Sequence, residues 1–286
     1  MPLNKQVFKT RALTAVVFVV IMCAMLLWSH WSFFALFLVV HAGCWWEYAR
    51  LSAKIENLKL HSWVVAGCIL SGMAIMLAFA GNAYSWGSYP LAGNLMLPFA
   101  VAGFLLVAMG IMQRSTVISF RGMGRLAFGW VYISLGWGTM LGLRQYGMDS
   151  VLGDMGRMVP VLLIGSIWVN DTMAYIAGSI FGKTPLSAIS PKKTWEGTLI
   201  GAALAIAVVA LAARFGFNTS WPHALVIPAI GAIAGTLGDL WESKLKRMAG
   251  VKDSGNFMPG HGGFLDRFDS MLVATPVCWL WITLAG

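Results

Sequence analysis

The sequence is poor in charged side chains. Asp, Glu, Lys and Arg together make up 11% of its 286 residues, against about 25% in typical soluble domains. Hydrophobic residues make up 58% and the mean hydropathy is +0.74, so there is too little polar surface to cover a water-soluble globule of this size. The composition excludes a soluble enzyme and a disordered chain. It predicts a polytopic membrane protein.

Cysteine is also scarce. All of the cysteines lie in apolar stretches, without a CxxC pair and without a His and Cys grouping at metal-ligand spacing: Cys23, Cys44, Cys68 and Cys278. This excludes a disulfide scaffold and argues against a zinc site, so we interpret the four thiols as small buried core residues. A cleavable signal peptide is not indicated either, because the first apolar run continues for about twenty residues into further spans.

Long apolar runs dominate the sequence instead. A hydrocarbon core of about 30 Å needs roughly 20 apolar residues in a helix, and a helix satisfies its own backbone in lipid. The sequence therefore predicts an all-α polytopic membrane protein with about nine transmembrane helices, the first two separated by a break at Ser29 to Ser32. The predicted spans are 12–31, 32–46, 63–80, 95–112, 126–143, 158–180, 198–213, 224–240 and 271–285.

The basic residues are distributed unevenly among the loops between these spans. If the N-terminus is cytoplasmic, 17 of the 20 lysines and arginines fall in cytoplasmic segments, and the exceptions are Arg144, Arg157 and Arg214. The positive-inside rule accounts for this bias and predicts a cytoplasmic N-terminus. The net charge of +9 is therefore interpreted as a topology signal, and we expect no nucleic-acid partner.

The acidic residues are few enough to consider individually. Four fall in loops or at span ends and are interpreted as ordinary solvated charges: Glu47, Glu56, Asp149 and Asp154. The other seven lie near predicted cytoplasmic membrane surfaces: Asp171, Glu196, Asp239, Glu242, Asp253, Asp266 and Asp269. We therefore expect residues 1–157 to form a transmembrane scaffold and residues 158–286 to form the catalytic half. The absence of an internal repeat disfavours an inverted-repeat transporter.

Asp171 lies inside the apolar run Met158 to Ile180. A charged residue deep in a span costs roughly 2.5–3.5 kcal/mol on insertion scales. Two interpretations stay open. Either the carboxylate faces a water-filled cleft, or the run is two shorter helices and the second is capped by Asn170, Asp171 and Thr172.

Hydroxyl and ammonium groups are concentrated just before the span at 198–213, in Ser190, Lys192, Lys193 and Thr194. Lysines and the amides of a helix N-terminus form a natural phosphate site. The alternative is a positive-inside anchor with Ser190 as N-cap and Pro191 at the first helical position. The two interpretations are compatible.

A second concentration of polar residues runs from Gly238 to Asp269. If the helix continues beyond the membrane, four of its side chains share one face at i, i+3, i+4 and i+7: Asp239, Glu242, Ser243 and Lys246. The glycine-rich turn Gly260 to Gly263 would let backbone N–H groups approach an anion. Asp266 and Asp269 share a face of the last helix, although helix-dipole stabilisation of about 0.3–1 kcal/mol each is a simpler role for them.

Carboxylates without thiolates or several histidines select oxygen-loving cations, chiefly Mg²⁺. Together with lysines, arginine and glycine turns at a membrane surface, they indicate metal-dependent chemistry on phosphates. From the residues alone we expect phosphoryl or nucleotidyl transfer at the cytoplasmic face, with the substrate left open.

The segment from Ser243 to Asp269 resembles the signature of the phosphatidate cytidylyltransferases, also called CDP-diacylglycerol synthases. It contains Ser243-x-Leu245-Lys246-Arg247-x(4)-Lys252-Asp253-x-Gly255 and Pro259-x-His261-Gly262-Gly263-Phe264-x-Asp266-Arg267-Phe268-Asp269. Met258 replaces an expected Leu, Ile or Phe, which is a mild departure. Upstream blocks are similar too: Asp171-Thr172-x-Ala174-Tyr175-x-x-Gly178, Phe181-Gly182-Lys183, Ser190-Pro191-x-Lys193-Thr194-Trp195-Glu196-Gly197 and Gly238-Asp239-Leu240-x-Glu242-Ser243.

The resemblance implies transfer of the cytidylyl group of CTP to phosphatidate, giving CDP-diacylglycerol and pyrophosphate. It implies CTP, phosphatidate and membrane lipid as partners and Mg²⁺ as cofactor, at a bacterial cytoplasmic (inner) membrane with the site facing the cytoplasm. A second cation and a homo-oligomer are left open. The alternatives are a CTP-dependent transferase for another membrane lipid, a catalytically silent relative, and a membrane transporter.

The resemblance also implies roles for individual residues. Asp239, Asp266 and Lys193 are the expected catalytic residues. The expected metal ligands are Asp239, Asp266, Asp269 and Asp171. The expected substrate-binding residues are Ser190, Lys192, Thr194, Ser243, Lys246, Arg247, Lys252, His261, Gly262, Gly263 and Arg267.

Overall fold

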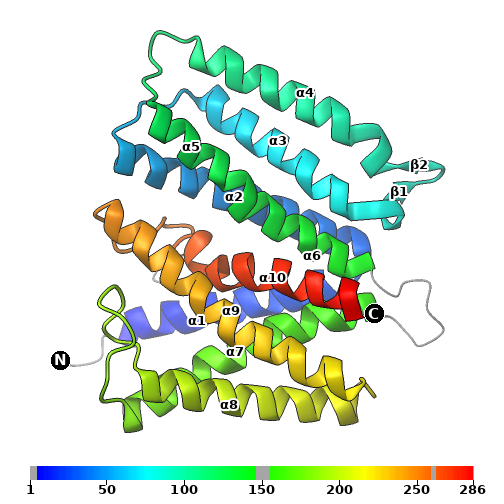
Figure 1. Cartoon of the computed structure of the whole chain (residues 1–286), viewed down its shortest axis with the longest axis vertical. Coiled ribbons are helices and arrows are strands. Elements are labelled where there is room, and N and C mark those ends of the chain that lie inside the picture. Colours follow the sequence, from blue (N-terminus) through cyan, green and yellow to red (C-terminus); the bar gives the residue numbers. More distant parts are fainter. Residues whose placement is uncertain (1–4, 146–154, 259–261, 286) are drawn as a thin grey trace. The chain divides into compact units, whose positions relative to one another are not determined.

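The structure, a computed structural model, describes residues 5–145, 155–258 and 262–285, most of which are helical (Figure 1). The helices are α1 (Lys5–Leu27), α2 (His30–Glu56), α3 (Ser62–Ala80), α4 (Leu91–Ile111), α5 (Phe120–Gly129), α6 (Leu135–Gln145), α7 (Met155–Phe181), α8 (Trp195–Leu211), α9 (Trp221–Met248) and α10 (Leu265–Ala285). A π-helical turn, Trp130–Ser134, joins α5 to α6, and another, Ala212–Gly216, extends α8. The strands β1 (Ser85–Trp86) and β2 (Tyr89–Pro90) form a short antiparallel hairpin. The predicted all-α fold is confirmed.

Each predicted span falls on a helix of its own. In the described part of the chain, seven helices are long and apolar enough to cross a membrane, namely α3, α4, the continuous α5–α6, α7, α8, α9 and α10. The other two predicted spans differ from these. The apolar part of α1 is the shorter stretch Leu13–Leu27, and α2 carries His41, Glu47 and Arg50 along its length. For α1 and α2, a transmembrane position therefore stays a prediction.

The break between α1 and α2 lies where the sequence predicts it. Ser29 is the N-cap of α2, and its hydroxyl accepts a hydrogen bond from the Ser32 amide at 3.0 Å. The Ser32 hydroxyl in turn accepts one from the Ser29 amide at 3.0 Å. This reciprocal capping satisfies amides that the helix start leaves without an intrahelical partner.

The chain divides into two compact units. The first unit contains residues 1–142 and 248–268, and the second contains residues 143–247 and 269–286. The 248–268 segment, predicted as part of the catalytic half, thus belongs with the N-terminal helices. The compact units do not coincide with the predicted division at residue 157, and a catalytic role for the C-terminal half stays a prediction.

Aromatic packing explains why the 248–268 segment belongs to the first unit. The Phe268 ring lies edge-on to Trp137 at 5.5 Å between centroids and to Phe18 at 5.9 Å. Trp137 also stacks on Phe37 of α2 at 4.9 Å. Aromatic pairs at such separations contribute about 0.5–1.5 kcal/mol beyond the area that they bury.

Small residues let the helices of each unit approach closely. In the first unit, a Cβ added at Gly103 of α4 would lie 2.8 Å from the carbonyl oxygen of Gly67 in α3. In the second unit, a Cβ at Gly197 of α8 would lie 2.7 Å from the Cα of Gly178 in α7. Such contacts are typical of helix packing in membranes, where lipid provides no hydrophobic drive between helices.

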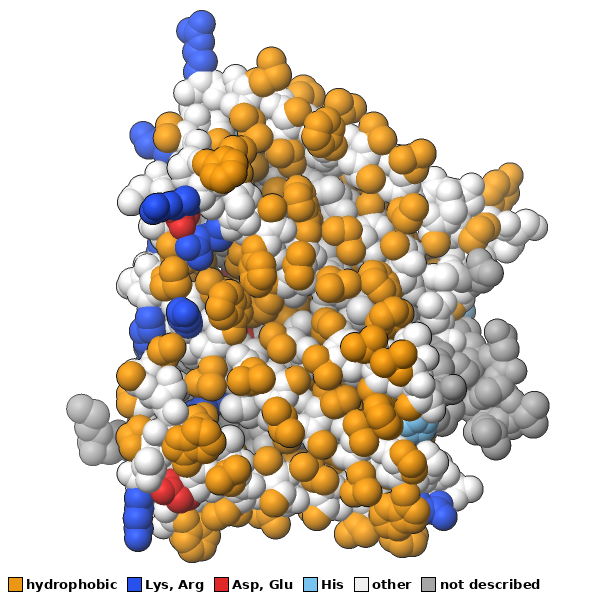
Figure 2. All heavy atoms as spheres, in the orientation of Figure 1, with side chains coloured by type: hydrophobic (Ala, Val, Ile, Leu, Met, Phe, Trp, Pro, Cys, Tyr) orange, Lys and Arg blue, Asp and Glu red, His pale blue; other side chains and the backbone are white. Residues whose placement is uncertain are grey.

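Apolar side chains cover much of the surface. Leu97 and Phe104 on α4 are 66% and 70% exposed, and Leu199 on α8 is 62% exposed. Figure 2 shows hydrophobic side chains over most of the face in view. Continuous apolar surface of this kind is unfavourable in water and favourable in lipid. The chain is an integral membrane protein.

The cysteines mostly follow the prediction. All four are free, and Cys44, Cys68 and Cys278 are buried. Cys23 is exposed, so its interpretation as a buried core residue is wrong. It lies on α1 among other exposed apolar side chains such as Val19 and Val20.

Candidate functional site

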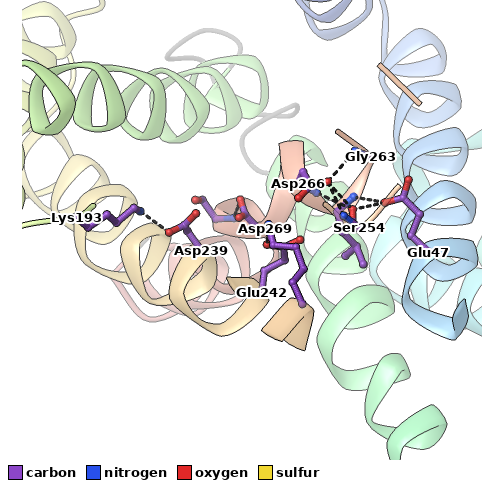
Figure 3. Close-up of polar contacts among 11 residues, drawn as sticks. Glu47, Lys193, Asp239, Glu242, Ser254, Gly263, Asp266 and Asp269 are labelled. Atoms are coloured by element: carbon purple, nitrogen blue, oxygen red, sulfur yellow. Dashed lines mark hydrogen bonds and ion pairs between the residues drawn. The ribbon is translucent and has the colours of Figure 1, made fainter. Parts of the chain in front are cut away.

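Two carboxylates of the second unit, Asp239 on α9 and Asp269 on α10, lie close together. Gly238 makes this approach possible, because a Cβ at that position would lie 3.0 Å from the Cα of Ser270. Asp269 is 7% exposed. Asp239 is close enough for the two carboxylates to interact electrostatically. Figure 3 shows both side chains at the facing surfaces of the two helices.

Lysines accompany these carboxylates. The Lys193 ammonium pairs with Asp239, and the two side chains are 32% and 27% exposed (Figure 3). Lys246 pairs with Glu242 one helical turn away, and the Glu242 side chain is fully buried. Both lysines are also close enough to Asp269 to attract its carboxylate electrostatically. The second unit therefore combines acidic and basic groups at the end of α9, as the sequence predicts.

The predicted helical face on α9 is confirmed. The helix runs unbroken to Met248, and Asp239, Ser243 and Lys246 are partly buried along it while Glu242 is buried. Arg247 lies in the last turn and is exposed. The i, i+3, i+4, i+7 spacing thus places the polar groups on the packed side of the helix.

The loop that carries Lys193 is closed by backbone hydrogen bonds. The Leu186 amide donates to the Lys193 carbonyl at 2.7 Å, and the Trp195 amide donates to the Thr184 carbonyl at 2.9 Å. The Glu196 carboxylate accepts hydrogen bonds from the amides of Lys183 and Thr184, both at 3.1 Å. These contacts hold Lys193 at the end of a fixed loop.

The N-cap predicted for this loop is wrong. Thr194, not Ser190, caps α8, and its hydroxyl accepts a hydrogen bond from the Gly197 amide at 3.2 Å. Ser190 instead begins a turn, in which the Lys193 amide donates to the Ser190 carbonyl at 3.1 Å. Lys192 is exposed in the same turn. The helix therefore begins only at Trp195, and Pro191 lies outside it.

The cap proposed for Asp171 is wrong as well. Helix α7 is continuous over Met155–Phe181, so Asp171 does not begin a second helix. Its side chain is exposed. A role for Asp171 in a metal site stays a prediction.

In the first unit, Asp266 is held at the start of α10. Its Oδ2 accepts hydrogen bonds from the amides of Ser254 and Gly263, both at 2.8 Å, and the Ser254 hydroxyl lies 2.8 Å away. Gly262 adopts a φ of +85°, a conformation that side chains disfavour, and this turns the chain toward Asp266. Lys252 and Arg267 are exposed on either side of this turn.

One amide of the predicted glycine turn has a partner within the chain. The Gly263 amide, expected to contact phosphate, donates to Asp266, so it is not open to an anion in this structure. A role of the Gly263 amide in binding phosphate stays a prediction. His261 and Gly260 lie outside the described residues, and their predicted roles are untested.

Glu47 is the functional candidate that the sequence interpretation missed. It is 4% exposed, so its interpretation as a solvated charge is wrong. Its carboxylate accepts hydrogen bonds from the amides of Phe264 and Leu265, both at 2.9 Å, and from the Ser254 hydroxyl at 2.6 Å. The available signal was an isolated acid directly after the apolar Trp45-Trp46 pair. The partners lie over 200 residues away, and local pattern does not reveal such pairs.

The other acids of that group differ from Glu47. Glu56 pairs with Arg125 at 2.7 Å and is partly exposed. Asp149 and Asp154 lie outside the described residues.

The donor set of the second unit suits a hard cation. Within the described ranges, no group of three or more His, Cys, Asp or Glu side chains is arranged to hold a metal ion. Asp239 and Asp269 supply carboxylate oxygens, which Mg²⁺ prefers, and Mg²⁺ usually takes its remaining ligands from water and substrate phosphates. Two carboxylates beside lysines fit a metal ion whose remaining ligands are water and the phosphates of the substrate.

Comparisons with known proteins agree with this chemistry. A family model described as "Cytidylyltransferase family" matches residues 9–285. A phosphatidate cytidylyltransferase of Synechocystis sp. is 32% identical over 290 residues, which cover 96% of each chain. One of Pseudomonas aeruginosa is 30% identical over 278 residues, or 94% of each. The chloroplastic phosphatidate cytidylyltransferase 4 of Arabidopsis thaliana is 40% identical over 132 residues, and the match spans only 33% of that protein.

Proposed function

Because the chain belongs to the cytidylyltransferase family, we propose that it transfers the cytidylyl group of CTP to phosphatidate, giving CDP-diacylglycerol and pyrophosphate. The relatives that match along nearly their whole length are named for this activity. The observation that supports it best is the arrangement of Lys193, in the loop before α8, with Asp239 of α9 and Asp269 near the start of α10. A lipid headgroup and a water-soluble nucleotide can meet at such a position.

The chemistry requires little proton transfer. The second pKa of a phosphate monoester is about 6, so phosphatidate carries most of its negative charge at neutral pH. One of its oxygens attacks the α-phosphorus of CTP, the new phosphoanhydride bond forms, and the bond to the β-phosphate oxygen breaks to release pyrophosphate. The main barrier is the approach of two anions, so the protein acts by positioning and electrostatic stabilisation.

The lysines provide the compensating charge. Lys193 is a third exposed and paired with Asp239, so it can exchange this partner for a phosphate at little cost. Lys246 neutralises buried Glu242 and acts on Asp269, and it contributes to the field at the site. Ser190, Lys192, Ser243, Arg247, Lys252 and Arg267 are further substrate-binding candidates.

Mg²⁺ is the proposed cofactor. Asp239 and Asp269 of the second unit would hold it, and the expected ligand roles of Asp266 and Asp171 stay predictions. Bound there, the cation would neutralise charge on phosphate oxygens. The carboxylates of the chain would then hold the cation between α9 and α10, beside Lys193.

The proposed location of the site is the cytoplasmic face of a bacterial inner membrane. The excess of lysine and arginine in alternate loops supports this orientation. In the first unit the Lys59 and Val117 backbones pair at 2.9 Å, and in the second the Lys193–Asp239 pair joins a basic loop to α9. Within each unit, basic segments assigned to the same side therefore lie together.

Turnover with defined substrates tests this function. Purified protein in detergent micelles with phosphatidate, CTP and Mg²⁺ should release pyrophosphate, and omission of either substrate should stop the release. Turnover only with another lipid phosphate would indicate a different acceptor. Nucleotide-independent transport of a solute by the protein reconstituted in lipid vesicles would indicate a transporter. No turnover with any phosphatidate species would refute the proposal.

A further inference from the structure

The carboxylate of Glu47 reaches from α2 into the signature segment of the first unit. It accepts hydrogen bonds from the first amide of α10, Leu265, and from the preceding amide, Phe264, both at 2.9 Å. Figure 3 shows the Glu47 side chain directed at Ser254, with the contacts marked. Residues 1–157 were predicted to be scaffold, yet this residue contacts the stretch richest in family motifs.

The surroundings of Glu47 leave room for this carboxylate and little else. A Cβ at Gly255 would lie 2.6 Å from the Glu47 Cδ, and one at Gly263 would enter the carboxylate itself. Gly43, one turn earlier on α2, similarly leaves space for the Phe264 ring. Burying a carboxylate is costly unless its oxygens are hydrogen-bonded, and three donors satisfy Glu47. The segment is thus built around one buried charge.

Ser254 connects Glu47 to Asp266. Its hydroxyl lies 2.6 Å from Oε2 of Glu47 and 2.8 Å from Oδ2 of Asp266. The Ser254 amide also donates to Asp266 at 2.8 Å. Because Glu47 holds Ser254 and the start of α10, it determines where the Asp266 carboxylate lies. We propose that Glu47 is a positioning residue that acts through Ser254 and the α10 N-terminus on Asp266, an inference that rests on the proposed function.

The test is the variant Glu47→Gln, which keeps the shape of the side chain. One acceptor oxygen becomes an NH₂ group that faces a donor, so Ser254 or an amide of α10 loses its partner. Loss of a residue that orients a metal ligand typically costs about 10–100-fold in activity or metal affinity. We expect kcat to fall by about that factor and the Mg²⁺ concentration for half-maximal rate to rise, while KM for CTP changes little.

Hydrogen–deuterium exchange provides a readout that does not depend on turnover. In Glu47→Gln, the amides of Ser254, Gly263, Phe264 and Leu265 should exchange faster than in the wild type. The matched control is Glu56→Gln, which removes a carboxylate of the same helix that pairs with Arg125 and does not contact this segment. It should leave kcat, the Mg²⁺ dependence and this exchange pattern unchanged.

A double variant tests the connection through Ser254. Ser254→Ala should reproduce the kinetic defect, and Glu47→Gln with Ser254→Ala should be less than multiplicative, because both changes break one chain of contacts. Multiplicative effects would overturn the route through Ser254.

The remaining outcomes separate the two proposals. An active wild type with an unaffected Glu47→Gln variant, or one in which only the melting temperature falls, overturns the positioning role alone. A kinetic defect without faster exchange also overturns it. A wild type without CTP- and phosphatidate-dependent turnover overturns the proposed function and the positioning role with it.

Discussion

At the scale of single residues, Lys193 and Lys246 of the second unit differ in how much each contributes to the stability of the fold. Lys193 and Asp239 are both about a third exposed, and a pair so accessible to water contributes about 0–1 kcal/mol to stability. Lys246 neutralises Glu242, whose side chain is fully buried. Removing one partner of a buried ion pair typically costs about 3–5 kcal/mol.

Lys193→Met and Lys246→Met should therefore have different effects. Lys246→Met leaves the Glu242 charge buried without its partner and should lower the melting temperature by several degrees. Lys193→Met should leave the melting temperature nearly unchanged and reduce turnover about 100–1,000-fold, since it removes a charge aimed at the phosphates. Thermal unfolding and pyrophosphate release measure the two effects. Equal melting temperatures for both variants would contradict the distinction.

Asp239→Asn tests the candidate metal ligand at the same scale. Asparagine keeps the size of the side chain but loses the charge that pairs with Lys193. Turnover should fall by at least about 100-fold, the range seen when a group that stabilises the transition state is removed, while the protein stays folded. The assay is pyrophosphate release at increasing Mg²⁺, beside Glu56→Gln as control. Substantial residual turnover would remove Asp239 from the proposed metal site.

At the scale of helices, the approach of α9 and α10 depends on Gly238. Its hydrogen faces the backbone at Asp269 and Ser270, and this contact brings the two carboxylates to the same place. A methyl group there would meet backbone atoms, which cannot rotate away as a side chain does. The distance between the helices, and with it the spacing of Asp239 from Asp269, should therefore depend on this glycine.

Gly238→Ala should lower both turnover and melting temperature. The matched control is Gly165→Ala in α7 of the same unit, where an added Cβ meets no atom within 4 Å. Alanine is favoured over glycine inside a helix by about 1 kcal/mol, so the control should be neutral or stabilising. Turnover and thermal unfolding of both variants provide the comparison. Unchanged turnover and melting temperature in Gly238→Ala would show that the site does not depend on the close approach of α9 and α10.

At the scale of the whole molecule, the distribution of lysine and arginine predicts the orientation in the membrane. The turn between β1 and β2 carries no charge, and Ser88 within it is exposed. The connection between α4 and α5 carries Arg114, and Ser115 beside it is exposed. The positive-inside rule assigns these positions to opposite sides.

Reporter insertions at Ser88 and Ser115 test this topology. A reporter active only outside the cytoplasm should be active at Ser88 and silent at Ser115, and a cytoplasmic reporter should behave in the opposite way. The two positions flank one apolar helix, α4, so each serves as the control for the other. The same side for both would contradict α4 as a membrane span.

Local hydropathy and local capping are sufficient to predict the membrane class, a helix at each apolar run and the break at Ser29. The sequence also predicts the polar face of α9, since helical periodicity places Asp239 and Lys246 on one side. The motifs that identify the family are contiguous in the sequence as well.

Contacts between residues that are distant in the sequence depend on how the whole chain folds. Thr194 rather than Ser190 caps α8 because the loop before it closes through backbone pairs between Leu186 and Lys193. The 248–268 segment joins the N-terminal unit through aromatic contacts. Glu47 is buried because three donors from that segment converge on it. The physical reason is common to all three. Hydropathy and periodicity describe a few neighbouring residues, whereas the closed loop, the aromatic contacts and the buried charge depend on partners that only the folded chain brings together.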